Sequence, residues 1–540
     1  MGDPYAEAVR YFDLGRFERA ATKLQGLLRN DPECVECYDL LARIATSEGQ
    51  DSLAATWYRL ALEVVPENAA LFQKLGIAEH RVGEYEQALW DLTHSLDLNA
   101  ANGESHFAIG NIWYDLDSLE LAKQGYLQAI ALDSTAAKYH FQLALVYYET
   151  DQPDSALTEF QRAYRWYPKS TQAYELSATI LIDQGRWEEV VAVLEAGLVS
   201  APETPNTRYW LGGAYVEVGD YHRAADILGG YVIRNQTHVG ALYNYGIALY
   251  EIGEYEKAVT YLSTVQEQKP DLLKARLYLG RALSALDQDS LAFAVFDSLT
   301  ISDPDYYEVW IDRGDIHLIR ARYGPAIEQY QQAGAIDPWR WEAFHRQGLT
   351  EYYQGHYALA EQSLLLAWRR DDSTATVYDA LGDVAAAMGE DDFSIYYYSR
   401  VLRKQPENNA VRTKLVDALM RQHLWSFAKE QLLWLYKQDL KDEVVLYRLA
   451  RVIEADGDTV SARGYFEQFM AIHSLRRQRE RLELRLRIDS RNPRHHREMG
   501  FFYRRQGNDA QARNYFRRAV ALGDTSLSVS DYFEEGGGQN

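Results

Sequence analysis

Two cysteines, Cys34 and Cys37, are the residues of this chain whose types and spacing come closest to a chemical site. A cysteine in the first turn of a helix can become a reactive thiolate, because the helix N-terminus favours negative charge. Glu33 and Glu36 flank the pair, and nearby carboxylates disfavour a thiolate. We therefore interpret the cysteines as structural or incidental. A local disulfide in an oxidising compartment and a thiol redox factor are the alternatives.

Other catalytic and metal-binding patterns are missing from the sequence. The adjacent His495 and His496 lack the H-E-x-x-H spacing of a zinc enzyme, and neither G-x-x-x-x-G-K-[ST] nor G-x-G-x-x-G occurs. A structural zinc site at Cys34 and Cys37 would need two more ligands, and none lies close in sequence. We predict no catalytic residue, no metal site and no cofactor, and we expect that the protein is not an enzyme.

The helices that would position these side chains follow a period of 34 residues, counted from Met1. Position 8 is Gly or Ala in thirteen of the first fourteen repeats, position 20 is Ala in twelve, and position 24 is always large and apolar. Position 15 is Gly in nine repeats and position 32 is Pro in eight. Small residues at 8 and 20 let two helices approach closely, whereas Gly at 15 and Pro at 32 end helices. The sequence predicts two helices per repeat, A and B, which must stack on neighbouring repeats.

These columns resemble a known family, the tetratricopeptide repeat (TPR) proteins. Two repeats show the signature residues well: Trp310, Arg313, Gly314, Ala326, Tyr330, Ala333 and Pro338 in one, and Tyr378, Leu381, Gly382, Gly389 and Pro406 in the other. The resemblance implies an all-α, right-handed superhelical solenoid of about 15 helix-turn-helix units. It also implies a concave face, lined by A helices, that binds peptides or partner proteins.

In this family, positions 2, 5, 9, 12 and 13 of helix A point into the groove. The resemblance therefore implies a groove with many aromatic rings: Tyr5, Phe12, Phe107, Asn111, Tyr114, Phe141, Tyr148, Tyr209, Tyr243, Tyr250 and Tyr352. Later repeats add His345, Tyr353, Asp315, Asp379, Asp383 and Asp417. Such a groove suits an extended peptide or an amphipathic helix, although some rings are expected to pack between neighbouring A helices.

The sequence lacks the residues of one known binding role of TPR proteins. Chaperone-binding members clamp a terminal carboxylate with Lys at position 5 and Asn at position 9. Repeat 4 has Asn111 at position 9 but Phe107 at position 5, and no repeat has the Lys–Asn pair. The acidic groove predicts a protein or peptide partner that is neutral or basic. The main hypothesis is thus a protein-interaction scaffold.

The repeat frame fails after Ser474 and returns at Pro493. We predict fourteen contiguous repeats over 1–474, an Arg-rich insertion or extended helix over 475–492, a fifteenth repeat over 493–525 and a disordered tail over 526–540. In the insertion, Leu482, Leu484, Leu486 and Ile488 alternate as in a strand, whereas Leu475, Leu482 and Leu486 share one face of a helix. A lengthened B helix is favoured, because a strand would have no partner.

Positive charge gathers near the C-terminal end. Residues 471–520 contain 14 Arg and five acids, although the whole chain carries a net charge of −23. This segment is either a solvated face or a docking patch for an acidic partner, including another copy of the chain, with RNA or another polyanion as a third alternative. The patch residues are Arg477, Arg481, Arg485, Arg487, Arg494, Arg497, Arg504 and Arg505. Self-assembly through this end is the second functional hypothesis.

The remaining composition bears on location and on other partners. The net negative charge argues against broad binding to nucleic acid or to anionic membranes. No apolar run is long enough for a membrane span, and the first residues do not form a signal peptide. The expected location is cytoplasmic by default, or periplasmic or exported if the chain begins after a removed signal.

Overall fold

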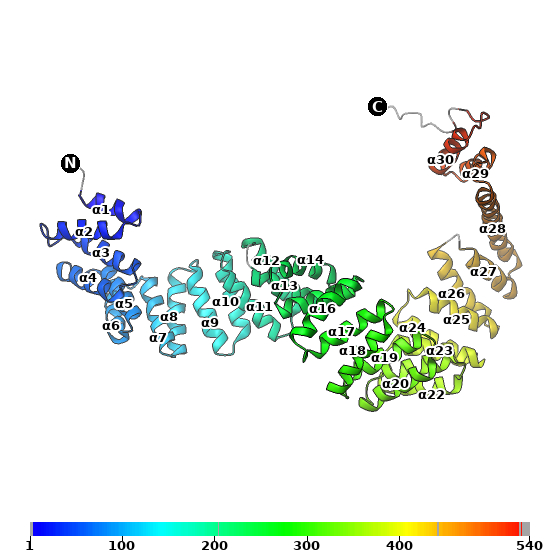
Figure 1. The fold of residues 1–540 in the computed structure, drawn as a ribbon, viewed down its shortest axis with the longest axis horizontal. Helices are drawn as coiled ribbons and strands as arrows, with labels where there is room; N and C mark the ends of the chain where they lie inside the picture. The colour runs from blue at the N-terminus through cyan, green and yellow to red at the C-terminus, as the bar shows by residue number, and fades with distance from the viewer. Residues whose placement is uncertain (1–3, 203–204, 440–441, 529–530, 532–540) are drawn as a thin grey trace. The chain divides into compact units, whose positions relative to one another are not determined.

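The computed structural model describes residues 4–202, 205–439, 442–528 and 531, which form 30 α-helices and no strand (Figure 1). The odd-numbered helices are the A helices: α1 (Pro4–Asp13), α3 (Val35–Ser47), α5 (Ala69–Val82), α7 (Gly103–Asp115), α9 (Ala137–Glu149), α11 (Thr171–Asp183), α13 (Pro205–Glu217), α15 (Val239–Glu251), α17 (Leu273–Ala285), α19 (Tyr307–Ile319), α21 (Glu342–Tyr353), α23 (Ala375–Met388), α25 (Asn409–Arg421), α27 (Glu443–Ala455) and α29 (Pro493–Arg505). The even-numbered helices are the B helices: α2 (Phe17–Leu28), α4 (Asp51–Val64), α6 (Tyr85–Leu98), α8 (Leu119–Leu132), α10 (Pro153–Trp166), α12 (Trp187–Ser200), α14 (Tyr221–Arg234), α16 (Tyr255–Gln268), α18 (Asp289–Ser302), α20 (Tyr323–Ile336), α22 (Tyr357–Arg370), α24 (Asp391–Lys404), α26 (Trp425–Gln438), α28 (Thr459–Ile488) and α30 (Asp509–Ala521). The predicted all-α solenoid of about fifteen helix-turn-helix units is confirmed.

The chain forms two compact bodies, an N-terminal body (Met1–Val295) and a C-terminal body (Phe296–Asn540). Within each body, the closest packing joins a helix to the next one along the chain. Consecutive A helices also touch, as α13 and α15 do in the N-terminal body and α21 and α23 do in the C-terminal body. Each repeat therefore buries its apolar faces against its neighbours, which is how a solenoid is stabilised.

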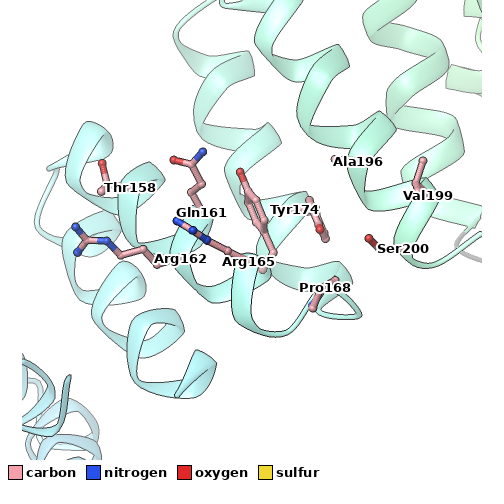
Figure 2. Close-up of a pocket in the computed structure, with 10 residues that line it drawn as sticks. Thr158, Gln161, Arg162, Arg165, Pro168, Tyr174, Ala196, Val199 and Ser200 are labelled. Carbon is pink, nitrogen blue, oxygen red and sulfur yellow. The ribbon is translucent and has the colours of Figure 1, made fainter. Parts of the chain in front are cut away.

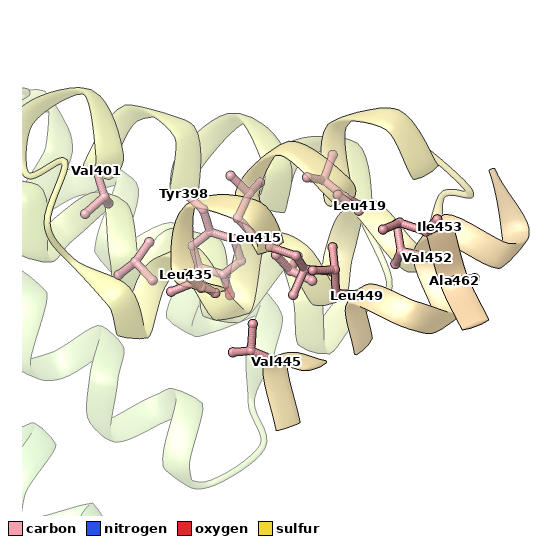
Figure 3. Packing of buried hydrophobic residues seen from close by; sticks show 14 of the residues in the cluster. Tyr398, Val401, Leu415, Leu419, Leu435, Val445, Leu449, Val452, Ile453 and Ala462 are labelled. Carbon is pink, nitrogen blue, oxygen red and sulfur yellow. The ribbon is translucent and has the colours of Figure 1, made fainter. Parts of the chain in front are cut away.

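The small residue at position 8 makes room for the large residue at position 24 of the same repeat. A Cβ atom added at Gly110 would lie 2.7 Å from the ring of Tyr126, and one added at Gly246 would lie 2.7 Å from Leu262. A Cβ atom added at Gly382 would likewise clash with the Tyr398 ring, and Figure 3 shows how Tyr398 also packs near leucines of the following repeats. These contacts explain the columns from which the helices were predicted.

Every repeat turns at position 15 through a left-handed residue. Ten repeats use glycines there, with φ between 67° and 97°: Gly15, Gly49, Gly83, Gly185, Gly219, Gly253, Gly355, Gly389, Gly457 and Gly507. The other five use Asp117, Asp151, Asp287, Ala321 and His423, with φ between 53° and 60°. The predicted turn is thus present even where glycine is not. Ala321 is the residue type least suited to a positive φ, because alanine has no polar side chain that could hydrogen-bond to the backbone in this conformation.

We expect Ala321→Gly to stabilise the C-terminal body by up to about 1 kcal/mol, because glycine adopts a positive φ without a Cβ clash. Urea denaturation followed by circular dichroism would measure the change. The matched control is Gly355→Ala at position 15 of the next repeat, where φ is 81° and a loss of stability is expected. Unchanged stability in both variants would show that this turn does not limit stability.

Helix α28 is the longest helix, with 30 residues from Thr459 to Ile488. Residues 475–488, for which the sequence pattern allowed either a strand or a helix, are therefore helical. Helices α29 and α30 form the fifteenth hairpin, and Asp524 and Asp531 beyond it pair with Arg497 and Arg504. Residues 529, 530 and 532–540 of the predicted disordered tail lie outside the described residues. The domain boundaries drawn from the sequence remain a prediction.

Candidate functional site

Several predicted groove aromatics pack between helices. The Phe107 ring lies 5.7 Å from the Tyr126 ring and 4.9 Å from the Tyr139 ring, measured between centroids. The Phe141 ring lies 5.6 Å from the Phe160 ring. These position-5 rings therefore contribute to the packing within and between repeats, which is the alternative role expected for some of them.

Other predicted groove residues bind to their neighbours in the N-terminal body. The Tyr5 hydroxyl donates to the Glu36 carbonyl at 3.5 Å, and the Asn111 side chain accepts from the Tyr126 hydroxyl at 2.9 Å. The Tyr114 hydroxyl donates to Glu149, and burial together with this carboxylate raises the pKa of Tyr114 to about 12. The Phe12 ring packs on Phe17 and lies below the Arg43 guanidinium.

The position-12 tyrosines are more accessible. Tyr148 is exposed, and Tyr250 is partly exposed with its ring 5.6 Å from that of Tyr278. Tyr352 is partly exposed beside Tyr353 and Tyr357. The intermediate exposure of Tyr243, at position 5, is similar. These rings leave aromatic surface on the A helices for a partner.

Tyr209, one of the predicted groove residues, lines a pocket. This A-helix pocket has a volume of about 300 Å³ and is formed by Ile182, Trp187, Tyr209, Trp210, Gly213, Ala214, Glu217 and Asn244. Most of these residues come from the consecutive A helices α11, α13 and α15. A Cβ atom added at Gly213 would lie 3.0 Å from the Asn244 amide nitrogen, so the missing side chain of Gly213 helps to keep the pocket open.

The lining of the A-helix pocket suits a peptide. Trp187, Tyr209 and Trp210 offer flat apolar walls with polar tips, and the Asn244 amide can both donate to and accept from a peptide backbone. The Glu217 carboxylate is exposed at the pocket and can pair with a lysine or an arginine. Apolar walls with few polar groups are typical of binding sites.

A row of acids, which the sequence reasoning missed, runs past this pocket. Position 13 is acidic in five consecutive repeats, and all five side chains are exposed: Asp115, Glu149, Asp183, Glu217 and Glu251. His80 lies 2.7 Å from Asp115, and Glu149 accepts from Tyr114. Within the described residues, no ion pair involves Asp183, Glu217 or Glu251. The same 34-residue count that revealed the helices would have revealed this row.

The acids predicted for the C-terminal body are neutralised by bases of the next repeat. Each pairs with a residue at position 6 of that repeat: Asp315 with Arg346 at 2.8 Å, Asp379 and Asp383 with Lys414 at 2.9 and 2.7 Å, and Asp417 with Arg448 at 2.9 Å. Burial and the nearby Arg346 lower the pKa of His345 to about 4, so this groove residue is neutral at pH 7. Unpaired acidic charge on the A helices thus belongs mainly to the N-terminal body.

A larger pocket of about 730 Å³ lies among α10, α11 and α12 (Figure 2). Arg162, Arg165 and Tyr174 are among its lining residues. The Arg162 guanidinium already pairs with Glu159 at 2.5 Å, and the Tyr174 ring stacks on Tyr164 at 4.3 Å. This B-helix pocket contains none of the predicted groove residues, and its basic rim has the opposite charge to the acid row.

The two cysteines are joined in a disulfide, with their Cα atoms 5.3 Å apart. Cys34 is the residue before α3, and Cys37 is fully buried beside Leu40 and Leu41. The bond therefore lies at the junction of repeats 1 and 2. The redox hypothesis remains a prediction, which thiol titration with and without reductant would test.

The predicted Arg patch is partly neutralised by the chain's own acids. Arg485 and Arg494 both pair with Glu498, at 2.9 and 3.2 Å. Arg497 and Arg504 pair with Asp524 and Asp531. In the part of the chain that the structure describes, the other four have no acidic partner: Arg477, Arg481, Arg487 and Arg505. The accessible positive charge is therefore smaller than the sequence count suggests.

Two buried carboxyl residues, Glu79 and Asp91, line another pocket of the N-terminal body, with a volume of about 470 Å³. Glu79 is only 1% exposed and accepts from the Arg59 guanidinium at 2.7 Å. Asp91 is buried beside Glu79, and burial together with this neighbouring carboxylate raises the pKa of Asp91 to about 8. The raised pKa favours a protonated Asp91 carboxyl at pH 7, which can share its proton with the buried Glu79 carboxylate.

We expect the stability of the N-terminal body to fall as the pH rises from about 4 to about 8. Over this range folded Asp91 keeps a proton that unfolded Asp91 has lost, which gives a slope of up to about 1.4 kcal/mol per pH unit. Asp91→Asn should remove this part of the slope, because an amide can donate to Glu79 without titrating. Thermal melts across this pH range would measure it, with Asp97→Asn, an exposed site on the same helix, as the control. An unchanged slope in Asp91→Asn would contradict the shared proton.

A family model described as tetratricopeptide repeat matches residues 5–69 and 141–206. This chain is a tetratricopeptide repeat protein. A second family model, described as anaphase-promoting complex, cyclosome, subunit 3, matches residues 196–265 of this TPR protein, the range that holds most of the A-helix pocket.

Curated relatives match parts of this TPR protein. DnaJ homolog subfamily C member 7 of Homo sapiens is 22% identical over 321 residues, which are 56% of this chain and 60% of the relative. Tetratricopeptide repeat protein 8 of Caenorhabditis elegans is 24% identical over 176 residues, which are 33% of this chain and 34% of the relative. The matches thus span less than two thirds of either relative. The crystal structure of the APC/C hetero-tetramer Cut9-Hcn1 is similar with a TM-score of 0.37 and 14% identity, over 83% of this chain and 95% of that one.

No helix in the described ranges is both long enough and apolar enough to cross a membrane.

Proposed function

We propose that this TPR protein is a protein-interaction scaffold whose A-helix pocket binds a peptide segment that carries both apolar and basic side chains. The observation that carries the proposal is the combination of Trp187, Tyr209 and Trp210 around the space left by Gly213, with Glu217 at its side. The aromatic walls suit an apolar side chain, and Asn244 suits the peptide backbone.

The acid row gives the proposed partner its charge. Asp183, Glu217 and Glu251 stand one repeat apart along α11, α13 and α15 and are exposed. Lysines or arginines spaced along a bound segment would meet one carboxylate per repeat. Because these acids are exposed, salt should weaken the attraction, with a Debye length of about 8 Å at physiological ionic strength. A neutral partner would use the aromatic walls alone.

We expect peptides selected from a random library on the full chain to be rich in Lys or Arg next to apolar residues. The triple variant Asp183→Lys, Glu217→Lys and Glu251→Lys should bind the selected peptides at least about tenfold more weakly, because three attractive charges become repulsive. Fluorescence anisotropy at low and high salt would measure the affinities, and the difference between the proteins should shrink at high salt.

The matched control reverses three exposed acids on the B helices of the same body: Glu86→Lys, Glu188→Lys and Glu256→Lys. The net charge of the two triple variants is the same, so only the place of the charge differs. Selected peptides that are acidic, or equal loss of binding in both triple variants, would contradict the proposed site.

Self-association through the Arg-rich end remains a second proposal. It is supported by the four guanidiniums without an acidic partner in the described residues and by the net charge of −23 of the whole chain. Association of this kind would weaken as salt is added.

A further inference from the structure

One position of the repeat is buried throughout the chain except at a single place. Position 24 is at most 5% exposed in repeats 1 to 13: Leu24, Tyr58, Leu92, Tyr126, Phe160, Leu194, Leu228, Leu262, Phe296, Tyr330, Leu364, Tyr398 and Leu432. In repeat 14 the equivalent residue is Phe466, and it is 41% exposed. The fifteenth repeat restores the rule, because Phe516 is fully buried.

The length of α28 explains the exception. The fifteenth hairpin packs near the far end of α28, where Met499 and Phe502 of α29 surround Leu482 (Figure 1). Leu482 lies 16 residues beyond Phe466, which is about 24 Å along a helix. Leu482 and Leu486 also lie nearly opposite Phe466 around the helix axis, since each residue turns the helix by about 100°. Helix α29 therefore does not cover Phe466.

Several exposed apolar side chains of α28 therefore lie along one side of the helix. Leu484 follows Phe466 by 18 residues, which is five helical turns, so both point in the same direction. Met470 and Ile488 are related in the same way and lie close to this direction. Met470, Leu484 and Ile488 are 49%, 56% and 77% exposed. We call the surface formed by Phe466, Met470, Leu484, Ile488 and the arginines between them the α28 face.

The half of the α28 face next to α27 is a groove. Its volume is about 440 Å³, and its lining includes Tyr447 and Ala450 of α27 together with Phe466 of α28. Val444 and Tyr447 add exposed apolar surface on α27. In an ordinary repeat, this is where the next A helix packs. The groove is therefore suited to bind a helix.

The charged residues that line the groove are balanced, with Arg451 and Arg463 against Glu454 and Glu467, and positive charge is in excess only further along α28. Arg463, Arg477 and Arg481 turn toward the α28 face, and the structure shows no acidic partner for them within the described residues. Glu480 also lies on this side of α28, but its carboxylate pairs with Arg476 at 3.6 Å, so the positive excess lies at Arg477 and Arg481 in the middle of the helix. A helix bound here would gain from acidic residues beside its apolar stripe.

We propose that the α28 face binds an amphipathic helix of a partner protein, whose apolar stripe covers Phe466, Met470 and Leu484 and whose acidic flanks meet Arg477 and Arg481. This site is separate from the A-helix pocket and does not depend on the function proposed for it.

A second copy of the chain is less suited to bind the α28 face. Two α28 helices packed antiparallel, with the apolar residues of one end against those of the other, would bring Arg477 of both copies together at the symmetry axis. The first A helix of another copy is also unsuitable, because Glu7 and Arg10 occupy positions where Leu75 and Ala78 of repeat 3 are buried. A partner with acidic flanks avoids both conflicts.

The test uses two designed helical peptides of about 20 residues with the same Leu and Ile stripe, one flanked by Glu and the other by Lys. Fluorescence anisotropy with the full chain should show that the Glu-flanked peptide binds at least about tenfold more tightly. Leu484→Asp and Arg477→Glu should each weaken this binding at least about fivefold, because one removes apolar contact and the other reverses the charge.

The control substitution is Ile301→Asp, a site that is also strongly exposed but lies on α18. Leu484 is exposed and points away from the buried Leu482, so Leu484→Asp should retain the melting temperature of the unmodified chain, which circular dichroism would check. Equal affinity for the two peptides would overturn the proposal. Unchanged binding in Leu484→Asp, or binding replaced by self-association that Leu484→Asp abolishes, would also overturn it.

Discussion

Tyr330→Ala is expected to lower the free energy of unfolding of the C-terminal body by about 3–5 kcal/mol. Tyr330 is fully buried at position 24, its ring fills the space beside Gly314, and its hydroxyl donates to Asp315 at 2.7 Å. Truncation to alanine leaves a cavity between two helices and removes this hydrogen bond. Urea denaturation followed by circular dichroism would measure the loss.

Two comparison variants separate the causes. Tyr330→Phe keeps the ring and should cost only about 1 kcal/mol, because Asp315 still accepts from Arg346 at 2.8 Å. Phe466→Ala changes the same position of repeat 14, where the ring is half-exposed, and should cost far less than Tyr330→Ala. Equal losses in Tyr330→Ala and Phe466→Ala would show that position 24 does not stabilise the repeats through burial.

The second large effect is expected on binding. Gly213→Leu should weaken the affinity for the selected basic and apolar peptides about 30-fold, which corresponds to about 2 kcal/mol. The new side chain would fill the space between Trp210 and Asn244 that the peptide is proposed to occupy. It should not disturb the fold strongly, because the nearest atom to a Cβ at this position is the movable amide of Asn244. Calorimetric titration would measure the affinity.

The matched control is Gly230→Leu in the same repeat. Gly230 lies within α14, and a Cβ atom added there would meet no atom within 4 Å. Both variants place the same side chain on a helix of repeat 7, so their effects on helix propensity are alike. If Gly230→Leu weakened binding as much as Gly213→Leu, the loss would come from the helices and not from the pocket.

Much of the fold could be predicted because the same residue types pack in the same way in every repeat. The small residues at positions 8 and 20 and the large residue at 24 are direct consequences of helices in close contact, so they repeat every 34 residues. The turn at position 15 was predicted from glycine, yet Asp117, Ala321 and His423 adopt the same left-handed shape. There the packing of the flanking helices, and not the local residue, determines the backbone.

The candidate site was harder to predict because it depends on contacts between repeats. Phe107 and Phe141 occupy groove positions of the family, but their rings pack on neighbouring core residues. Asp315 and Arg346 are 31 residues apart, as are Asp417 and Arg448, so the ion pairs that neutralise these acids could have been recognised from spacing. The pocket beside Tyr209 depends on a missing side chain at Gly213, for which the family pattern gave no signal.

The most direct test of the central claim is photo-crosslinking of a selected peptide that carries a light-activated group next to its basic residue, followed by mass spectrometry of the linked fragments. Binding in the A-helix pocket predicts links to α11, α13 and α15, near Trp210, Glu217 and Asn244. Links to the B-helix pocket on α10 and α12, beside Arg165 and Val199, would contradict it.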